Sequence, residues 1–146
     1  MARTTAMERE AADLLGRTSL FSELSKRELL AIARAGKEVG RAEGATLARE
    51  GETGVGFFLI LEGDATVSIA GRPAGVLTKG DTFGEVALLD GGPRTASVEA
   101  TSPVRLFGLT QWAFTRVVRE HPTVALKLLQ VLAGYVRNSA SGLPQL

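Results

Sequence analysis

The segment from residue 83 to residue 97 carries the residue types that bind a sugar and a phosphate side by side. An acid, Glu85, follows Gly84, and a short apolar stretch and a glycine-rich link then lead to Arg94. An arginine fork can pair with two phosphate oxygens, and free N–H groups at a helix start supply further donors. A carboxylate can accept the hydrogen bond of a ribose hydroxyl. The segment therefore predicts a site for a ribose phosphate.

The spacing within this segment sets how these groups can converge. We predict that residues 85–89 form a short helix, where the small side chain of Ala87 lets a ligand approach the backbone amide. A carboxylate beside a phosphate repels it, so Arg94 must offset the negative charge of both groups. Thr95 and Ser97 are one residue apart, so both can face the same side of an extended strand.

The bulk properties are those of one globular domain. The chain has 146 residues, of which 45% are hydrophobic and 23% charged. The net charge of +1 gives no broad electrostatic basis for binding nucleic acid or an anionic membrane, so neither direct nucleic-acid binding nor membrane insertion is expected. The absence of cysteine excludes disulfides and thiol catalysis and fits a cytoplasmic protein. The N-terminal residues do not have the pattern of a signal peptide.

Helices are predicted at both ends of the chain. Residues 1–19 form an N-terminal helical segment, because apolar residues follow helical spacing there. A second helix begins after Ser25, since Glu28 lies three residues further on and completes a capping box. Two C-terminal helices are predicted after Thr110, a good N-cap, and from Pro122, which suits the start of a helix.

Between these helices, from Gly40 to Leu109, glycine is frequent and short β-prone runs alternate with turn residues. Gly71-Arg72-Pro73 is predicted to be a hairpin tip. The pattern indicates an α+β, mainly β fold: a small antiparallel β-barrel or jelly roll flanked by N-terminal helices and two C-terminal helices. The predicted strands lie near residues 46–49, 56–61, 65–69, 75–77, 95–100 and 104–109.

With these residues in view, the sequence resembles the cyclic nucleotide-binding domains of the catabolite activator protein, the regulatory subunit of protein kinase A and cyclic-nucleotide-gated channels. Residues 83–97 match the phosphate-binding cassette of that family almost fully. The resemblance runs from about Leu20 to Arg137, which gives a binding domain over residues 20–138 and a flexible tail at 139–146. The strand-and-turn pattern of the family is matched by Gly44, Leu47, Gly51, Glu52, Phe58, Ile60 and Gly63.

The resemblance implies a regulatory domain that binds cAMP or cGMP and is not an enzyme, with no metal and no further cofactor. Glu85, beside the Gly84 amide, would bind the ribose 2′-OH. Arg94 would pair with the cyclic phosphate, helped by the amides of Ala87 and Thr95. A threonine at the position of Thr95 occurs in members that prefer cAMP and in members that prefer cGMP, so this residue does not identify the base of the ligand. The ligand-binding residues that the resemblance implies are Phe83, Gly84, Glu85, Val86, Ala87, Arg94, Thr95 and Ser97.

In this family a residue of the C-terminal helix or of a neighbouring subunit also caps the base, and the candidates here are Tyr135 and Arg137. The alternatives are a packing role for Tyr135 and a solvated helix end for Arg137. Apolar contact to the base is expected around Phe58, Val76 and Leu77. Ligand binding would order the cassette and shift the C-terminal helix, which biases an existing equilibrium.

DNA-binding, channel and kinase members of the family carry an output module that this sequence does not contain. The output is therefore expected on an effector protein supplied in trans or in a part of the protein outside this sequence. A wide apolar face on the last helix also allows a homodimer.

Two other classes of function are weighed against nucleotide sensing. A metal-dependent enzyme on a similar barrel needs several converging ligands, which a single histidine outside the strands, His121, does not offer. The alternative is an interaction or dimerisation domain that no longer binds nucleotide. The presence of both Glu85 and Arg94 argues against this alternative.

Overall fold

The computed structural model describes residues 3–54 and 56–139, so the predicted tail at 139–146 lies outside the described residues apart from Ser139. The helices are α1 (Ala6–Leu15), α2 (Lys26–Ala35), α3 (Glu85–Asp90), α4 (Gln111–Glu120) and α5 (Pro122–Arg137). The strands are β1 (Lys37–Arg41), β2 (Thr46–Ala48), β3 (Gly56–Glu62), β4 (Ala65–Ile69), β5 (Arg72–Leu77), β6 (Thr82–Phe83), β7 (Ser97–Ala100) and β8 (Val104–Thr110).

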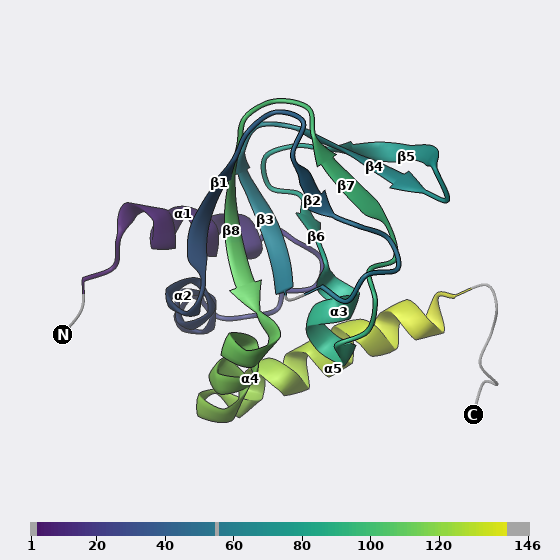
Figure 1. Ribbon diagram of the computed structural model, residues 1–146. Helices are drawn as coiled ribbons and strands as arrows, with labels where there is room; N and C mark the ends of the chain where they lie inside the picture. Colours follow the sequence, from purple (N-terminus) through teal and green to yellow (C-terminus); the bar gives the residue numbers. More distant parts are fainter. Residues whose placement is uncertain (1–2, 55, 140–146) are drawn as a thin grey trace.

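The strands form two four-stranded sheets, one in the order β1-β8-β3-β6 and the other in the order β2-β7-β4-β5. The strand pairs within both sheets are antiparallel. This arrangement fits a jelly roll with helices at both ends of the chain, so the predicted fold class is confirmed. Figure 1 shows α2, α3, α4 and α5 gathered at one end of the two sheets.

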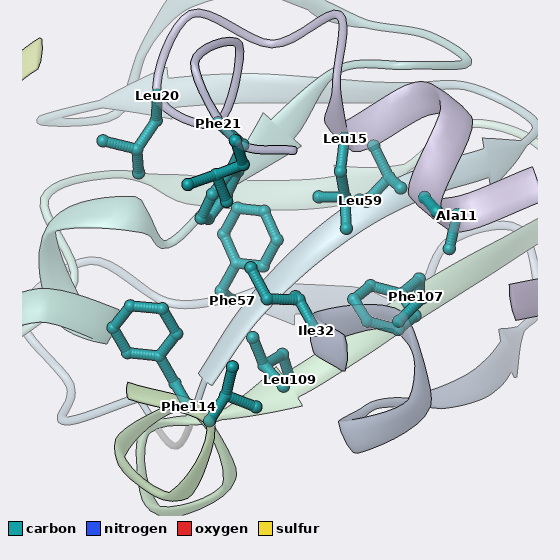
Figure 2. Packing of buried hydrophobic residues seen from close by; sticks show 14 of the residues in the cluster. Ala11, Leu15, Leu20, Phe21, Ile32, Phe57, Leu59, Phe107, Leu109 and Phe114 are labelled. Carbon is teal, nitrogen blue, oxygen red and sulfur yellow. The ribbon is translucent and has the colours of Figure 1, made fainter. Parts of the chain in front are cut away.

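Strands β3 and β8 bury both of their faces, which explains why their sequences are almost continuously apolar. Successive side chains of a strand point to opposite faces. Phe57, Leu59 and Phe107 therefore face the helices, while Ile60 and Leu106 face the other sheet. Figure 2 shows the helix-facing group packed against side chains of α1 and α2. These two strands therefore contribute to two hydrophobic clusters, one shared with the helices and the other with the second sheet.

The predicted helix starts are present. The backbone N–H of Ser25 donates to Glu28 Oε1 at 2.8 Å, and the N–H of Glu28 donates to Ser25 Oγ at 3.2 Å, which completes the capping box of α2. Thr110 caps α4 by accepting the N–H of Ala113 at 3.0 Å. Pro122 is the first residue of α5. These local signals therefore fix where three of the helices begin.

Glu28 also joins α2 to α5. Its side chain is buried, and its carboxylate accepts hydrogen bonds from Lys127 Nζ at 2.7 Å and from the Thr123 hydroxyl. Burial acts to raise the pKa of Glu28, but the hydrogen bonds from Lys127, Thr123 and Ser25 outweigh it and lower this pKa to about 2. The carboxylate is therefore a charged link between an N-terminal and a C-terminal helix.

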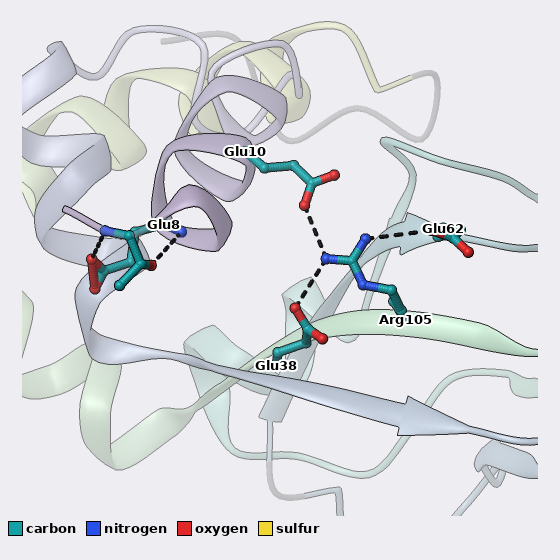
Figure 3. Close-up of polar contacts among 6 residues, drawn as sticks. Glu8, Glu10, Glu38, Glu62 and Arg105 are labelled. Atoms are coloured by element: carbon teal, nitrogen blue, oxygen red, sulfur yellow. Dashed lines mark hydrogen bonds and ion pairs between the residues drawn. The ribbon is translucent and has the colours of Figure 1, made fainter.

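Arg105 on β8 ties α1 to the first sheet. Its Nη2 lies 3.1 Å from Glu10 Oε1 and 2.9 Å from Glu38 Oε1, and its Nη1 lies 3.4 Å from Glu62 Oε1. Figure 3 shows the three carboxylates converging on this one guanidinium from separate elements. Hydrogen bonds to Glu38 and Glu10 raise the pKa of Arg105, so the cation persists at any working pH.

Some predicted boundaries are wrong. The hairpin tip is Ala70-Gly71, where both residues have positive φ (53° and 77°), and Arg72 and Pro73 already belong to β5. This is the geometry of a two-residue hairpin turn, and the proline is tolerated because β5 is an edge strand. Strands β1 and β6 were not predicted, because β1 is a mostly exposed edge strand and β6 has two residues.

Candidate functional site

A cavity of about 170 Å³, here called the α3 cavity, lies between the sheet β2-β7-β4-β5 and the segment around α3. Four apolar side chains from the four strands of that sheet form one wall: Ala48, Val67, Leu77 and Val98. The first turn of α3 and the segments before and after this helix form the other wall, with Thr82, Phe83, Gly84, Glu85, Val86, Ala87, Pro93, Arg94, Thr95 and Ala96. All the predicted ligand-binding residues except Ser97 therefore line one cavity.

Two glycines define α3. Gly84 precedes the helix with φ 88° and Gly91 follows it with φ 70°, a region that other residues seldom adopt. A Cβ on Gly84 would also lie 2.2 Å from Nη1 of Arg94. The glycine therefore allows both the sharp entry into α3 and the close approach of the guanidinium. The first N–H groups of such a helix have no acceptor within the helix and are available to an anion.

Arg94 is a buried cation. It is 8% exposed, and its Nη1 is buried with no hydrogen-bond partner among the described residues. Its guanidinium lies against Gly54, where a Cβ would be 1.9 Å from Nε, and 6.0 Å from the centre of the Phe58 ring. Burial lowers the pKa of Arg94 and the nearby Glu85 charge raises it. A buried unpaired donor of this kind calls for an anionic ligand.

The backbone holds Arg94 in place. Its N–H donates to the Glu52 carbonyl at 2.8 Å, and its carbonyl accepts the N–H of Gly51 at 2.9 Å. An isolated β-bridge joins Thr53 to Pro93 beside this pair. The link from α3 to β7 is therefore pinned to the turn before β3, and the guanidinium starts from a fixed backbone position.

Glu85 lies half-buried in the same cavity, on the first turn of α3. Its Oε1 accepts a hydrogen bond from the Thr82 hydroxyl. Glu85 and Arg94 interact electrostatically, yet among the described residues no hydrogen bond or ion pair within 4.0 Å joins them. The cavity therefore presents a carboxylate oxygen and a guanidinium that do not neutralise each other by direct contact.

The structure separates Thr95 from Ser97. Thr95 precedes β7 and lines the α3 cavity, whereas Ser97 is the first residue of β7 and accepts the N–H of Glu50 at 2.9 Å on its Oγ. Val98, the next residue along the strand, is the one that lines the cavity. The prediction that Thr95 and Ser97 face the same side of a strand is therefore wrong, because it required β7 to begin at Thr95, two residues before its actual start.

The two candidate base caps do not line the α3 cavity. Tyr135 lies in a second groove, here called the α5 groove, and its hydroxyl is 2.6 Å from Ser19 Oγ. The α5 groove adjoins the cavity, since Thr82, Glu85 and Val86 line both. Arg137 is exposed at the last residue of α5.

Among the residues expected to contact a base, Leu77 lines the cavity, whereas Val76 is 64% exposed and lines a different groove. Phe58 stacks on Phe83 with ring centres 5.3 Å apart, under Arg94. Sequence reasoning did not find Thr82 or Gly54. The signals for them are a hydroxyl three residues before the acid and a glycine in the turn that pairs with the arginine.

Within the described residues, no group of three or more histidine, cysteine, aspartate or glutamate side chains is arranged to hold a metal ion. No helix in those same residues is both long and apolar enough to cross a bilayer.

The family model of the cyclic nucleotide-binding domain matches residues 39–121, which include strands β2 to β8, α3 and Arg94. The chain therefore belongs to the cyclic nucleotide-binding domain family, and the predicted resemblance is confirmed.

Individual relatives agree with this assignment. The chain is 35% identical over 120 residues to a cAMP-dependent protein kinase regulatory subunit of Colletotrichum orbiculare, covering 81% of this chain and 31% of that protein. It resembles the N-terminal domain of a transcriptional regulator from Streptomyces coelicolor A3(2) with a TM-score of 0.81 and 29% identity, covering 92% of this chain and 96% of that one.

A third relative is the regulatory domain of Toxoplasma gondii PKA with cAMP. It superposes with a TM-score of 0.72 and 28% identity, covering 84% of this chain and 48% of that one. The chain spans about a third of the length of the first curated relatives that it matches.

Proposed function

We propose that this chain is the cyclic nucleotide-sensing part of a regulatory protein, in which Glu85 binds the ribose 2′-OH and Arg94 the cyclic phosphate. The observation that carries the proposal is the buried Arg94 Nη1, which has no hydrogen-bond partner within the described part of the chain and lies in the same cavity as a carboxylate. A 3′,5′-cyclic phosphate brings one negative charge to this one cation. Its ribose brings a hydroxyl to Glu85.

The charge balance favours a cyclic phosphate over a phosphomonoester. A phosphomonoester carries between one and two negative charges at neutral pH, and the second charge would lie close to the Glu85 carboxylate. The solved structure of a relative with cAMP supports the same ligand class for this fold. We therefore expect cAMP or cGMP to bind and 5′-AMP to bind more weakly.

The proposal includes a response of α5. Helix α3 contacts α4, and α4 contacts α5, so packed helices connect the cavity to the C-terminal helix. Tyr135 of α5 lies in the groove that adjoins the cavity. A ligand that moves α3 would change the contacts of α5 and so shift its position.

The proposal also places the output on α5. Leu126, Leu129 and Val136 are 57%, 62% and 46% exposed on this helix, an apolar surface suited to an effector protein or to a second copy of the chain. Sedimentation with and without cAMP distinguishes a ligand-dependent dimer from a monomer that requires an effector.

Calorimetric titration with cAMP, cGMP and 5′-AMP tests the binding itself. Arg94→Ala should weaken cyclic nucleotide binding by about 2–5 kcal/mol, because it removes one partner of a buried charge pair. The matched control is Arg119→Ala, which removes an exposed arginine on α4 and should leave the affinity unchanged. Equal affinities for wild type and Arg94→Ala would refute the role of Arg94, and no binding at millimolar nucleotide would refute the function.

A further inference from the structure

Thr82 directly precedes the cassette and is held by the sheet. It is the first residue of β6, where it pairs with Leu59 of β3, a side chain with no exposed surface. A β-branched side chain on a strand has few accessible χ1 rotamers. The hydroxyl of Thr82 is therefore presented from a rigid element, and it points to the Glu85 carboxylate, to which it donates a hydrogen bond.

The contact uses one of the two carboxylate oxygens of Glu85. Oε1 of Glu85 accepts the Thr82 hydroxyl, while Oε2 has no hydrogen-bond partner among the described residues. A glutamate side chain without such a contact loses rotamer freedom when it binds a ligand, which weakens binding. The Thr82 hydrogen bond restricts that freedom before the ligand arrives, and Oε2 stays available as an acceptor.

Arg94 does not provide this restraint. In the part of the chain that the structure describes, no hydrogen bond or ion pair within 4.0 Å joins the guanidinium to Glu85. Thr82 also lines both the α3 cavity and the adjoining groove, so its hydroxyl lies at the place where the ribose would meet the acid.

We infer that Thr82 is a positioning residue that holds Glu85 in the orientation that receives the ribose hydroxyl, and that it thereby sets the preference for ribose over 2′-deoxyribose in the ligand. The inference rests on the proposed function. Thr82 acts through Glu85, so its effect is confined to ligands that carry the 2′-OH.

The test is calorimetric titration of the whole chain with cAMP and with 2′-deoxy-cAMP. Thr82→Val keeps the shape and the strand propensity but removes the hydroxyl, and it should lower the affinity ratio of cAMP to 2′-deoxy-cAMP about fivefold, the effect of one hydrogen bond. Thr82→Ser keeps the hydroxyl and should retain the wild-type ratio. Thr82→Ala is measured beside Thr82→Val, so that loss of folding in one variant leaves the other to decide.

A Glu85→Ala background separates positioning from general support of the fold. There the ratio should be close to one, and adding Thr82→Val should not change it. The inference is overturned if the ratio is unchanged in Thr82→Val and Thr82→Ala, or if both ligands weaken by the same factor. A wild-type chain that binds both nucleotides equally overturns the inference but leaves nucleotide binding intact, whereas a chain that binds neither overturns both proposals.

Discussion

The position of the Arg94 guanidinium is set by backbone hydrogen bonds and by two neighbouring glycines that have no side chain. Two backbone hydrogen bonds, to Glu52 and Gly51, hold the residue, and Gly54 and Gly84 give the guanidinium room. Burying this cation without a partner is unfavourable, and the rest of the fold must offset that free energy until an anion arrives. An arginine placed in this way is suited to binding a phosphate and contributes little to stability in the free protein.

The space at Gly54 gives a test at the residue scale. Gly54→Ala would place a methyl group within the volume of the guanidinium, since the Cβ would lie 1.9 Å from Nε of Arg94. The arginine must then move, and we expect cyclic nucleotide binding to weaken by about 1.5–3 kcal/mol, the range for a hydrogen bond to a charged group. Calorimetry measures this loss, and thermal unfolding checks that the variant is folded.

The matched control for this substitution lies on α5. Apart from its two chain neighbours and the backbone of its own helix, no described residue has an atom within 4 Å of a Cβ at Gly134, so Gly134→Ala should leave the affinity unchanged and raise stability by about 0.5–1 kcal/mol. A Gly54→Ala protein that binds cyclic nucleotide as tightly as wild type would show that the guanidinium position is not critical.

At the scale of elements, the link between α2 and α5 depends on pH. Glu28 is 5% exposed and has its pKa lowered from 4.5 to about 2 by Lys127, Thr123 and Ser25 against the effect of burial. A carboxyl whose pKa is lower in the folded state stabilises the fold above its unfolded-state pKa. That stabilisation is lost as the pH falls through the folded-state pKa. The window for this group is therefore from about pH 4.5 down to about pH 2.

Urea unfolding over this window tests the link. The lowered pKa corresponds to about 3 kcal/mol of stability at pH 7, most of which should disappear between pH 4.5 and pH 2. Glu28→Gln should be less stable than wild type at pH 7, and the difference should shrink as the pH falls. Glu23→Gln, at an exposed position before α2, is the control and should not change the pH profile. A constant difference between wild type and Glu28→Gln would show that the charge of Glu28 is not involved.

The elements that could be predicted are those whose signals are local. The capping box at Ser25, the cap at Thr110 and the proline at the start of α5 each lie within one turn of the helix they begin. Strand β1 was not predicted, because Val39 is its one apolar side chain and gives no alternating pattern. Its pairing with β8 is a contact between residues far apart in the sequence. Edge strands have weak sequence signals for this reason.

The cassette was predicted because its glycine, acid and arginine lie within one short segment. The prediction that Ser97 faces the ligand was wrong. The orientation of this side chain depends on where β7 begins, and that start is set by the pairing of Ser97 with Ser68 of β4, which the sequence does not show. The surroundings of Arg94 could not be predicted, because Gly54 comes from a turn that is forty residues distant in sequence. The Thr82–Glu85 contact depends on the left-handed backbone at Gly84, which the sequence alone does not show.

For the whole molecule, α5 packs on the N-terminal part of the chain through apolar side chains such as Val124 and Leu128. Among the described residues, side-chain hydrogen bonds join the two parts near the start and near the end of α5. Near its start, Lys127 and Thr123 contact Glu28, and near its end Tyr135 contacts Ser19. The first contact is partly buried, because Glu28 is 5% exposed, whereas Ser19 and Tyr135 are both exposed. The C-terminal half of α5 is therefore held less firmly than its start, and it is the part that lies beside the α5 groove.

Removing the Tyr135 hydroxyl tests whether ligand binding releases this half of α5. Tyr135→Phe should speed amide exchange in the last turns of α5 about fivefold in the free protein, because one hydrogen bond to Ser19 is lost. Ser19→Ala should have the same effect, and the double variant should add nothing to it. With saturating cAMP the wild type and all three variants should exchange alike, since the proposed shift of α5 separates Tyr135 from Ser19 in the wild type as well. If the difference persists with cAMP bound, α5 stays docked on the N-terminal segment and the signal must leave the domain by another element.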